Sequence, residues 1–323
     1  MSDILTHTEA GVMTITLNRV EKKNSITVAM YAAMADALAS VAADPAVRVV
    51  VLQGHPTVFS AGNDIGDFVG RPPAVGTGDT PVCRFLRGIA SFPKPLVAAV
   101  CGPAVGVGTT MLFHCDLVYA GDNAAFAMPF VNLGLCPEAA SSLLVPQMLG
   151  YHRAAEALLL GEPFMAEAAL EVGLVNRVVP PMEASVLAQA QARKLAAKPL
   201  ASLMETRRLM KKGQAALVHQ QMDDEGAVFA RLLTESVRGN PMHPRESPKP
   251  VQSRRKTQPG LAPGKALQQR VGRFWGLTRR AGVSKDAGGC CAACQGTSLG
   301  CTSRLPQRPW PPRRGRILLP LTL

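Results

Sequence analysis

The sequence predicts an α/β fold with a mostly parallel sheet followed by a helical C-terminal part. Strand-like and helix-like patterns alternate between residues 12 and 119, which favours right-handed crossovers between parallel strands. Residues 47–52 are rich in β-branched side chains, as is typical of a strand buried on both faces. After residue 137 helical patterns dominate. Hydrophobic residues make up 47% of the 323 residues, enough for a sizeable core, which excludes a wholly disordered protein.

The first expected elements are a hairpin and a helix. Residues 12–17 alternate between apolar and polar side chains, which predicts a strand with one face exposed to water. Gly11 favours a turn that pairs this strand with residues 5–7. Thr27 is a good N-cap for a helix that ends before Pro45. The apolar stripe of this helix comprises Met30, Met34, Leu38 and Val41.

The remaining elements follow from the same two periodicities. We expect strands at residues 47–52, 96–100, 117–119 and 174–179. We expect helices at residues 82–90, 107–113, 137–149, 153–160, 166–172, 182–197, 200–210 and 214–236. Residues 1–199 therefore form the predicted core, and residues 200–237 form a C-terminal helical segment.

Residues 238–323 differ sharply from the rest of the chain. They hold 17 Lys and Arg against 2 Asp and Glu, a net charge of +15, whereas residues 1–237 carry a net charge of −3. The segment is rich in Pro, Gly, Ser and Arg and has no periodicity, so we predict a disordered tail. Its charge favours nonspecific attraction to polyanions over a specific nucleic-acid site. Our hypothesis is that a frameshift or read-through produced it, which resequencing codons 230–260 tests.

Signals for membrane, secretion and metal binding are absent from the sequence. The chain does not open on a basic region followed by an apolar run, and it has no stretch of eighteen apolar residues, so we expect neither a signal peptide nor a membrane span. The cysteines before residue 238 lack paired spacing, which favours reduced thiols and a cytoplasmic location. These are Cys83, Cys101, Cys115 and Cys136. Neither the six His nor the C-x-x-C of Cys291 and Cys294 has the spacing of a metal site, so we expect none.

Two loops of small residues follow predicted strands and are candidates for a ligand site. They are residues 59–64 (FSAGND) and 102–108 (GPAVGVG). Ligands of parallel sheets bind beyond the carboxyl ends of the strands, and converging backbone N–H groups there would form an oxyanion hole. Alternatively, the glycines serve tight turns and close packing. The spacing does not match G-x-G-x-x-G, which disfavours a dinucleotide site.

A third loop, residues 132–142, holds a carboxylate among apolar and small residues. Pro137 suits the first position of a helix, and Glu138 suits its first turn. Two interpretations of Glu138 stay open. It complements the dipole of the helix, or its apolar surroundings raise its pKa toward that of a working base.

Five segments together resemble the crotonase superfamily, the enoyl-CoA hydratase/isomerase fold. They are residues 18–25 (NRVEKKNS), 59–64 (FSAGND), 96–108 (LVAAVCGPAVGVG), 115–120 (CDLVYA) and 161–180. The first is similar to the N-R-P-E-K-x-N-A/S segment of the family, the second to its F-x-A-G-x-D loop, and the third to its A-x-x-G-x-A-x-G-x-G run. The similarity extends over about residues 3–237.

The resemblance implies a spiral of ββα turns with a helical C-terminal part, assembled as a homotrimer or a dimer of trimers. It implies an acyl-CoA thioester substrate, so that CoA is part of the substrate and no separate cofactor is needed. The backbone N–H groups of Asn63 and Val107 would hold the thioester carbonyl, with Val107 at a position where the family usually has glycine. The substrate would further contact Lys22, Lys23, Ala61, Gly62, Asp64, Gly106, Thr110 and Phe130.

Two of these assignments have simpler alternatives. Lys22 and Lys23 would lie near the CoA phosphates, but an isolated lysine pair is often a solvated turn. Asp64 would adjoin the substrate, but an aspartate after a loop often caps the following helix.

The pattern favours an isomerase over a hydratase. Hydration requires two acid/base groups, which are usually glutamates in this family, but Thr110 and Phe130 stand at their positions. Residues 129–142 instead resemble the P-F-x-x-L-G-x-x-P-E-x-x-S-S pattern of 3,2-enoyl-CoA isomerases, with Glu138 as the single glutamate. We therefore expect Glu138 to move the double bond of an enoyl-CoA from position 3 to position 2. A hydratase of the same fold and a non-catalytic acyl-CoA-binding module are the alternatives.

Overall fold

The computed structural model describes residues 2–64, 66–67 and 79–237, all within one compact unit of the chain, Met1–Gly276. The predicted tail, residues 238–323, lies outside the described residues. In the described part, no helix is long and apolar enough to cross a membrane. The four cysteines there are free thiols, as expected.

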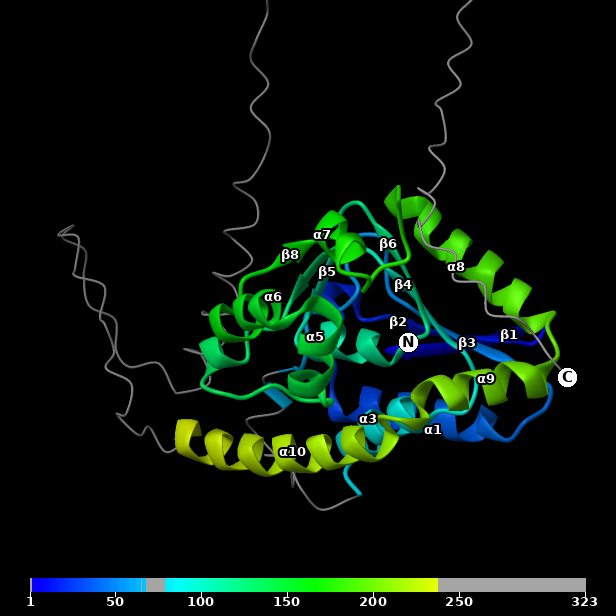
Figure 1. The fold of residues 1–323 in the computed structure, drawn as a ribbon. Helices are drawn as coiled ribbons and strands as arrows, with labels where there is room; N and C mark the ends of the chain where they lie inside the picture. The colour runs from blue at the N-terminus through cyan, green and yellow to red at the C-terminus, as the bar shows by residue number, and fades with distance from the viewer. Residues whose placement is uncertain (1, 65, 68–78, 238–323) are drawn as a thin grey trace, which may run out of the picture. The chain divides into compact units, whose positions relative to one another are not determined.

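Within the described residues, the main sheet has six strands in the order β1-β2-β3-β4-β6-β9 (Figure 1). They are β1 (Ile4–Glu9), β2 (Val12–Leu17), β3 (Val49–Gln53), β4 (Leu96–Val100), β6 (Leu117–Gly121) and β9 (Arg177–Val179). The β1–β2 pair is antiparallel, and the other neighbouring pairs are parallel. The predicted mostly parallel sheet is confirmed, although β9 forms only at the end of the expected strand 174–179.

A second, smaller sheet accompanies the main one. It contains β5 (Pro103–Val105), β7 (Ala125–Ala127) and β8 (Phe164–Met165) in that order. The chain passes from β4 in the main sheet to β5 in the small sheet, and again from β6 to β7, which produces the expected spiral of ββα turns. These three strands were not predicted from the sequence, because two or three residues are too few to show a period-2 pattern.

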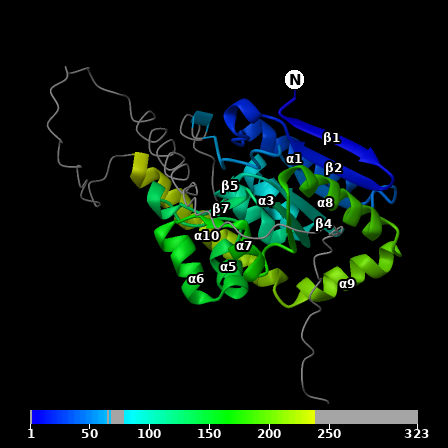
Figure 2. The same ribbon diagram turned by 90° about the horizontal axis from the view of Figure 1, so that it is seen from above.

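The helices lie at nearly the expected places. They are α1 (Val28–Ala42), α3 (Pro81–Ser91), α4 (Val107–Thr110), α5 (Ser141–Leu149), α6 (Tyr151–Ala155), α7 (Ala166–Glu171), α8 (Pro181–Ala196), α9 (Leu200–Lys212) and α10 (Ala215–Val237). Short 3-10 helices are η1 (Val20–Lys22), η2 (Met111–His114) and η3 (Val131–Leu133), and a π-helical turn forms η4 (Glu156–Leu160). Figures 1 and 2 both show α10 beside α5, which it contacts.

The N-terminal hairpin and the first helix form as predicted. Ala10 and Gly11 have φ angles of 49° and 77°, the conformation of a tight turn whose twist matches that of the two strands. The Thr27 side chain accepts a hydrogen bond from the N–H of Met30 at 3.2 Å and so caps α1.

The strands β2, β3 and β4 of the main sheet are buried on both faces, whereas the edge strand β1 is largely exposed. On β3, Val50 and Leu52 belong to the larger core cluster, whereas Val49 and Val51 belong to a second cluster that includes Ala188 and Ala192 of α8. The prediction of a wet face on β2 is therefore wrong. The helix α8 covers that face, and its Gln189 amide donates a hydrogen bond to the Thr14 hydroxyl at 2.7 Å.

Three of the predicted helices differ in extent. The helix expected at 153–160 is divided into α6 and the π-helical turn η4. The helix expected at 107–113 is divided into α4 and η2. The helix expected at 137–149 begins only at Ser141, so Pro137 is not its first residue and Glu138 is not in its first turn. Ala139 and Ala140 prevent an earlier start, because their φ angles of 62° and 55° are left-handed.

Candidate active site

The two small-residue loops run side by side. Ser60 and Ala104 form an isolated parallel bridge, in which the Val105 N–H donates to the Ser60 carbonyl at 2.9 Å. Asn63 and Val107 each follow this bridge by three residues, one in each loop. This is the pair whose N–H groups are expected from the sequence to converge.

Close approach of the loops depends on glycine. Gly62 has a φ of 86°, and a Cβ there would lie 2.8 Å from the Val105 carbonyl oxygen. Gly106, the residue that precedes α4, has φ 55° and ψ −121°, a conformation that side-chain-bearing residues rarely adopt. The glycines therefore serve close packing, as one interpretation held, and they also position the neighbouring N–H groups.

Both proposed donors have free backbone N–H groups within the described residues. The N–H of Asn63 donates no hydrogen bond there, while the N–H groups of Ala61 and Asp64 on either side do. The N–H of Val107 is at the first position of α4, where no intrahelical acceptor exists. The side chain of Val107 is fully buried in the core. Two N–H groups, one from each loop, are thus available to an oxygen atom.

Asn63 is also held through its side chain. The Tyr31 hydroxyl, from α1, donates a hydrogen bond to Oδ1 of Asn63. Burial, and then the charge of Glu138, raises the pKa of Tyr31 well above its ordinary value, so this hydroxyl keeps its proton. Tyr31 therefore links the loop of Asn63 to the neighbourhood of Glu138.

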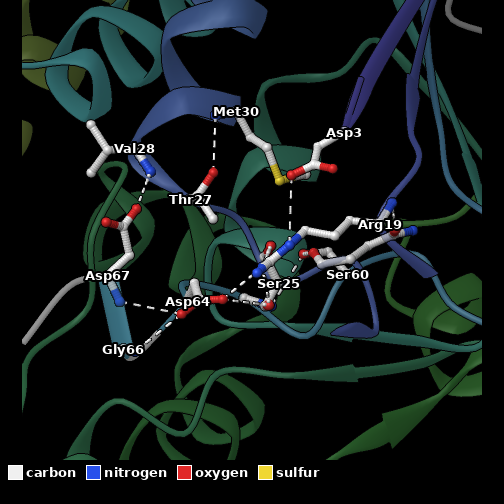
Figure 3. A network of polar contacts seen from close by, with 12 residues as sticks. Asp3, Arg19, Ser25, Thr27, Val28, Met30, Ser60, Asp64, Gly66 and Asp67 are labelled. Atoms are coloured by element: carbon white, nitrogen blue, oxygen red, sulfur yellow. Dashed lines mark hydrogen bonds and ion pairs between the residues drawn. The ribbon is translucent and has the colours of Figure 1, made fainter. Parts of the chain in front are cut away.

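Asp64 belongs to an ion-pair network rather than to this pair of N–H groups (Figure 3). Arg19 lies 2.6 Å from its Oδ2, and the Ser25 hydroxyl donates to the same oxygen at 3.1 Å. Oδ1 accepts the N–H groups of Gly66 and Asp67, residues that are helical. Burial alone would raise the pKa of Asp64, but these hydrogen bonds outweigh it and lower the pKa. The capping role expected as the simpler alternative is thus present.

The lysines expected near CoA lie on the surface beside this loop. Lys22 and Lys23 are exposed, at and just after η1. The carbonyl of Lys23 accepts the N–H of Ala61 at 2.9 Å, which ties the lysine segment to the loop of Asn63. The backbone of Lys23 is thus bonded to the loop of Asn63, and both lysines are open to solvent.

Glu138 is buried and has no ion-pair partner among the described residues. Its side chain is 8% exposed, and its Oε1 has no hydrogen-bond partner among the described residues. Burial, and then the carboxylate of Glu225, raises the pKa of Glu138 to about 8. No ion pair within the described residues includes either carboxyl group. Such a carboxyl is suited to exchanging a proton near neutral pH.

The turn that follows Glu138 is held from two sides. His114 at the end of η2 donates from Nε2 to the Ala139 carbonyl at 2.8 Å. Burial lowers the pKa of His114 to about 4, so the ring is a neutral donor at pH 7. From the other side, Oε2 of Glu225 accepts the Ala140 N–H at 2.7 Å, and Oε1 accepts the Ser142 N–H at 2.8 Å.

Thr110 and Phe130, the residues expected at the positions of the two hydratase glutamates, cannot ionise. Thr110 is fully buried, and its Oγ1 has no partner among the described residues. Phe130 is 5% exposed, and its ring reaches within 4.0 Å of the place that a Cβ on Gly106 would occupy. Phe130 therefore packs beside the turn that presents the Val107 N–H.

Three polar residues of this site were not predicted from the sequence: Tyr31, His114 and Glu225. A signal existed for the last. In α10, Met222, Phe229 and Leu233 follow a stripe with steps of three and four residues, and Glu225 occupies a position within it. An acid inside an apolar stripe indicates a buried partner. For His114 and Tyr31 the sequence carries no comparable signal, since both lie within ordinary apolar runs.

Comparison with known proteins identifies the family. A family model described as enoyl-CoA hydratase/isomerase matches residues 7–249. The rat protein enoyl-CoA delta isomerase 2 (Rattus norvegicus) is 37% identical over 237 residues, which cover 72% of this chain and 60% of the rat protein. The chain thus matches less than two thirds of that relative's length. The 2,3-dehydroadipyl-CoA hydratase of Escherichia coli is 29% identical over 232 residues, 72% of this chain and 91% of that protein.

A solved structure agrees with these matches over the whole fold. OdaA of Pseudomonas aeruginosa superposes with a TM-score of 0.71 at 43% identity, and the match covers 74% of this chain and 98% of OdaA. The two-sheet spiral, the paired loops and these matches lead to one conclusion. The chain belongs to the enoyl-CoA hydratase/isomerase family, the crotonase superfamily.

Proposed function

We propose that this protein is a 3,2-enoyl-CoA isomerase in which Glu138 carries the proton. The observation behind the proposal is that Glu138 is buried, lacks a hydrogen-bond partner for Oε1 among the described residues, and has a pKa raised to about 8. A carboxylate that served the dipole of α5 would bond to the N–H groups there. Glu225 already accepts those bonds, so Glu138 is left for chemistry.

The proposed reaction moves one proton and consumes nothing else. The Glu138 carboxylate takes a proton from C2 of the 3-enoyl-CoA, the carbon between the thioester carbonyl and the double bond. The electron pair of that C–H bond moves toward the thioester oxygen, which becomes a dienolate oxygen held by the N–H groups of Asn63 and Val107. The Glu138 carboxylic acid then returns the proton to C4, and the double bond lies between C2 and C3.

The surroundings of the acid support isomerisation over hydration. Addition of water calls for a second group that exchanges a proton, and the nonionisable Thr110 and Phe130 stand where that role is filled in hydratases of the family. A raised pKa makes Glu138 a stronger base than an ordinary glutamate, which suits the removal of a weakly acidic C2 proton. Isomerases and hydratases both match the chain, so the proposal of an isomerase rests on the acid/base groups and not on the relatives.

The experiment is to incubate the full chain with a 3-enoyl-CoA and a 2-enoyl-CoA side by side. We expect conversion of the first to its 2-enoyl isomer and no hydration of the second. In deuterated water we expect incomplete deuterium incorporation, because one shielded carboxyl carries the proton between two carbons. Hydration of 2-enoyl-CoA without isomerisation would establish the hydratase instead, and binding without either reaction would establish a non-catalytic module.

We also propose an oligomeric state and a cellular location for the protein. A homotrimer or a dimer of trimers would give a sedimentation mass of three or six chains in analytical ultracentrifugation. A cytoplasmic location would place the protein in the soluble fraction of fractionated cells, apart from organelle markers.

A further inference from the structure

The turn next to Glu138 is stabilised only in part by its own sequence. The N–H and the hydroxyl of Ser141 donate to the Glu138 carbonyl at 3.1 and 2.6 Å. However, Ala139 and Ala140 both have left-handed φ angles, which side-chain-bearing residues rarely adopt in succession. The residue before α5 is Ala140, which has no side chain able to cap the helix. The cap must therefore come from elsewhere in the chain.

Glu225 supplies the hydrogen-bond acceptors that cap this turn. It lies on α10, 83 to 85 residues later in the sequence, and its side chain is 6% exposed. Its two oxygens accept the N–H groups of Ala140 and Ser142 and the Ser142 hydroxyl, which is held in turn by the Gln221 amide at 2.8 Å. One carboxylate thus caps α5 and closes the turn that Glu138 begins.

The same carboxylate is a buried negative charge beside Glu138. Among the described residues, burial and then the charge of Glu138 raise the pKa of Tyr31 on α1, and burial and then the charges of Glu225 and Glu138 raise that of Cys136 beside the turn, so both groups keep their protons. Burial also raises the pKa of Glu225 itself, and the hydrogen bonds from Ser142 and Ala140 oppose that rise. Arg231 on α10 forms its ion pair with Glu235. Glu225 is therefore the group whose charge opposes ionisation of Glu138.

We propose that Glu225 is a positioning residue of the isomerase, which holds the 139–142 turn so that the Glu138 carboxyl stays buried and free to accept a proton. The inference rests on the proposed function, because it assigns the residue that prepares the proposed base. It also means that α10, the last described element, completes the site. Glu225 touches neither the substrate nor the reacting atoms; it acts through Glu138.

The test compares three variants of the full chain. Glu225→Gln keeps an oxygen acceptor and removes the charge; Glu225→Ala removes both. Asp224→Asn is the matched control, because Asp224 is the neighbouring exposed acid of α10, and its carboxylate accepts a bond from Gln220. The titration of Glu138 is followed by infrared difference spectroscopy of its carboxyl stretch, with Glu138→Gln as the reference, and kcat and KM are measured across pH.

We expect Glu225→Gln to lower the pKa of Glu138 and to move the rise of kcat/KM to lower pH. The pKa should stay above 4.5, because burial, the larger cause, remains. We expect Glu225→Ala to lower kcat by as much as about 10²-fold, the typical cost of a misplaced catalytic group, with KM little changed. The Asp224→Asn variant should behave as wild type in every measurement.

Two results would overturn the inference. One is a pKa of Glu138 in the Glu225→Gln variant equal to that in the wild type, and the other is a kcat of the Glu225→Ala variant equal to that of the wild type. If Glu225→Gln does not fold, Glu225→Asp replaces it: the retained charge should keep the wild-type pH profile, the shorter reach should lower kcat, and an unchanged kcat would overturn the inference. The infrared titration needs no turnover. A wild-type protein that fails to isomerise therefore defeats the proposed function separately from the role of Glu225.

Discussion

The 59–64 loop and the 138–142 turn are both parts of the candidate site, but they are built in different ways. The first pairs with its neighbours through the backbone, since Ser60 pairs with Ala104 and Ala61 donates to the Lys23 carbonyl, and Arg19 binds the side chain of Asp64 at its end. The second is held mainly by the buried side chains of His114 and Glu225. The first offers backbone N–H groups to the substrate, whereas the second offers a side chain. Side-chain substitutions other than at Gly62 should therefore be better tolerated in the first region than at the residues that hold the second.

The largest expected effect is that of Glu138→Gln, which removes the base and keeps size and polarity. We expect loss of 3-enoyl-CoA isomerisation by about 10²- to 10⁴-fold, the usual contribution of a positioned acid/base group. Binding of the thioester, measured by calorimetry, should be largely kept. Glu162→Gln, at an exposed glutamate, is the control and should isomerise as wild type. An active Glu138→Gln would return this glutamate to a structural role.

The next effect separates backbone from side chain in the oxyanion pair. Val107→Pro removes the N–H at the first position of α4, where proline is tolerated by helices, and should cost about 10²- to 10³-fold in kcat. Val107→Ala, its matched control, and Asn63→Ala keep their N–H groups and should retain most activity. If Asn63→Ala were as damaging as Val107→Pro, the side chain that Tyr31 contacts would be the functional part of Asn63.

The third effect concerns pH. The pKa of Glu138 is raised from 4.5 to about 8 on folding, so the folded state binds this proton more tightly than the unfolded state. Its ionisation therefore opposes folding, and its contribution to the free energy of unfolding should fall as pH rises from about 5 through 8, with a slope of at most about 1.4 kcal/mol for each step of one in pH. Glu138→Gln should lack this fall in denaturant titrations at pH 5 and pH 9. In the same range, kcat/KM of the wild type should rise with pH, because the carboxylate is the active form.

The smallest expected effect is that of a substitution at Asp64, in the 59–64 loop. Asp64→Asn removes the ion pair with Arg19 and weakens the cap on residues 66 and 67, and should lower the free energy of unfolding by about 1 kcal/mol. Because the pKa of Asp64 is lowered, this contribution is present above pH 4 and is lost as pH falls. The control is Asp36→Asn, which breaks an exposed pair with Arg84 and should change the unfolding midpoint less. A loss of several kcal/mol for Asp64→Asn would show that the two regions do not differ as described.

The pattern of apolar and polar residues within short segments was sufficient to predict most of the helices and strands of the fold. The strand β4, the helix α1 with its Thr27 cap, and the parallel order of the sheet were predicted from periodicity within short segments. The boundary of α5 was not. Pro137 and Glu138 fit a helix start by composition, yet the helix begins at Ser141 because two alanines take left-handed conformations that local preference disfavours.

The sequence by itself determined the strand and helix order, the resemblance to the crotonase superfamily, and Glu138 as the candidate base, because each depends on residues close together in the chain. The tertiary structure alone decided that α8 covers the second face of β2, that Tyr31 holds Asn63, and that His114 and Glu225 hold the turn of Glu138. The physical reason is distance along the chain. A buried carboxylate acquires its pKa and its geometry from groups up to 87 residues away, and no periodicity within a segment records which of them will pack against it.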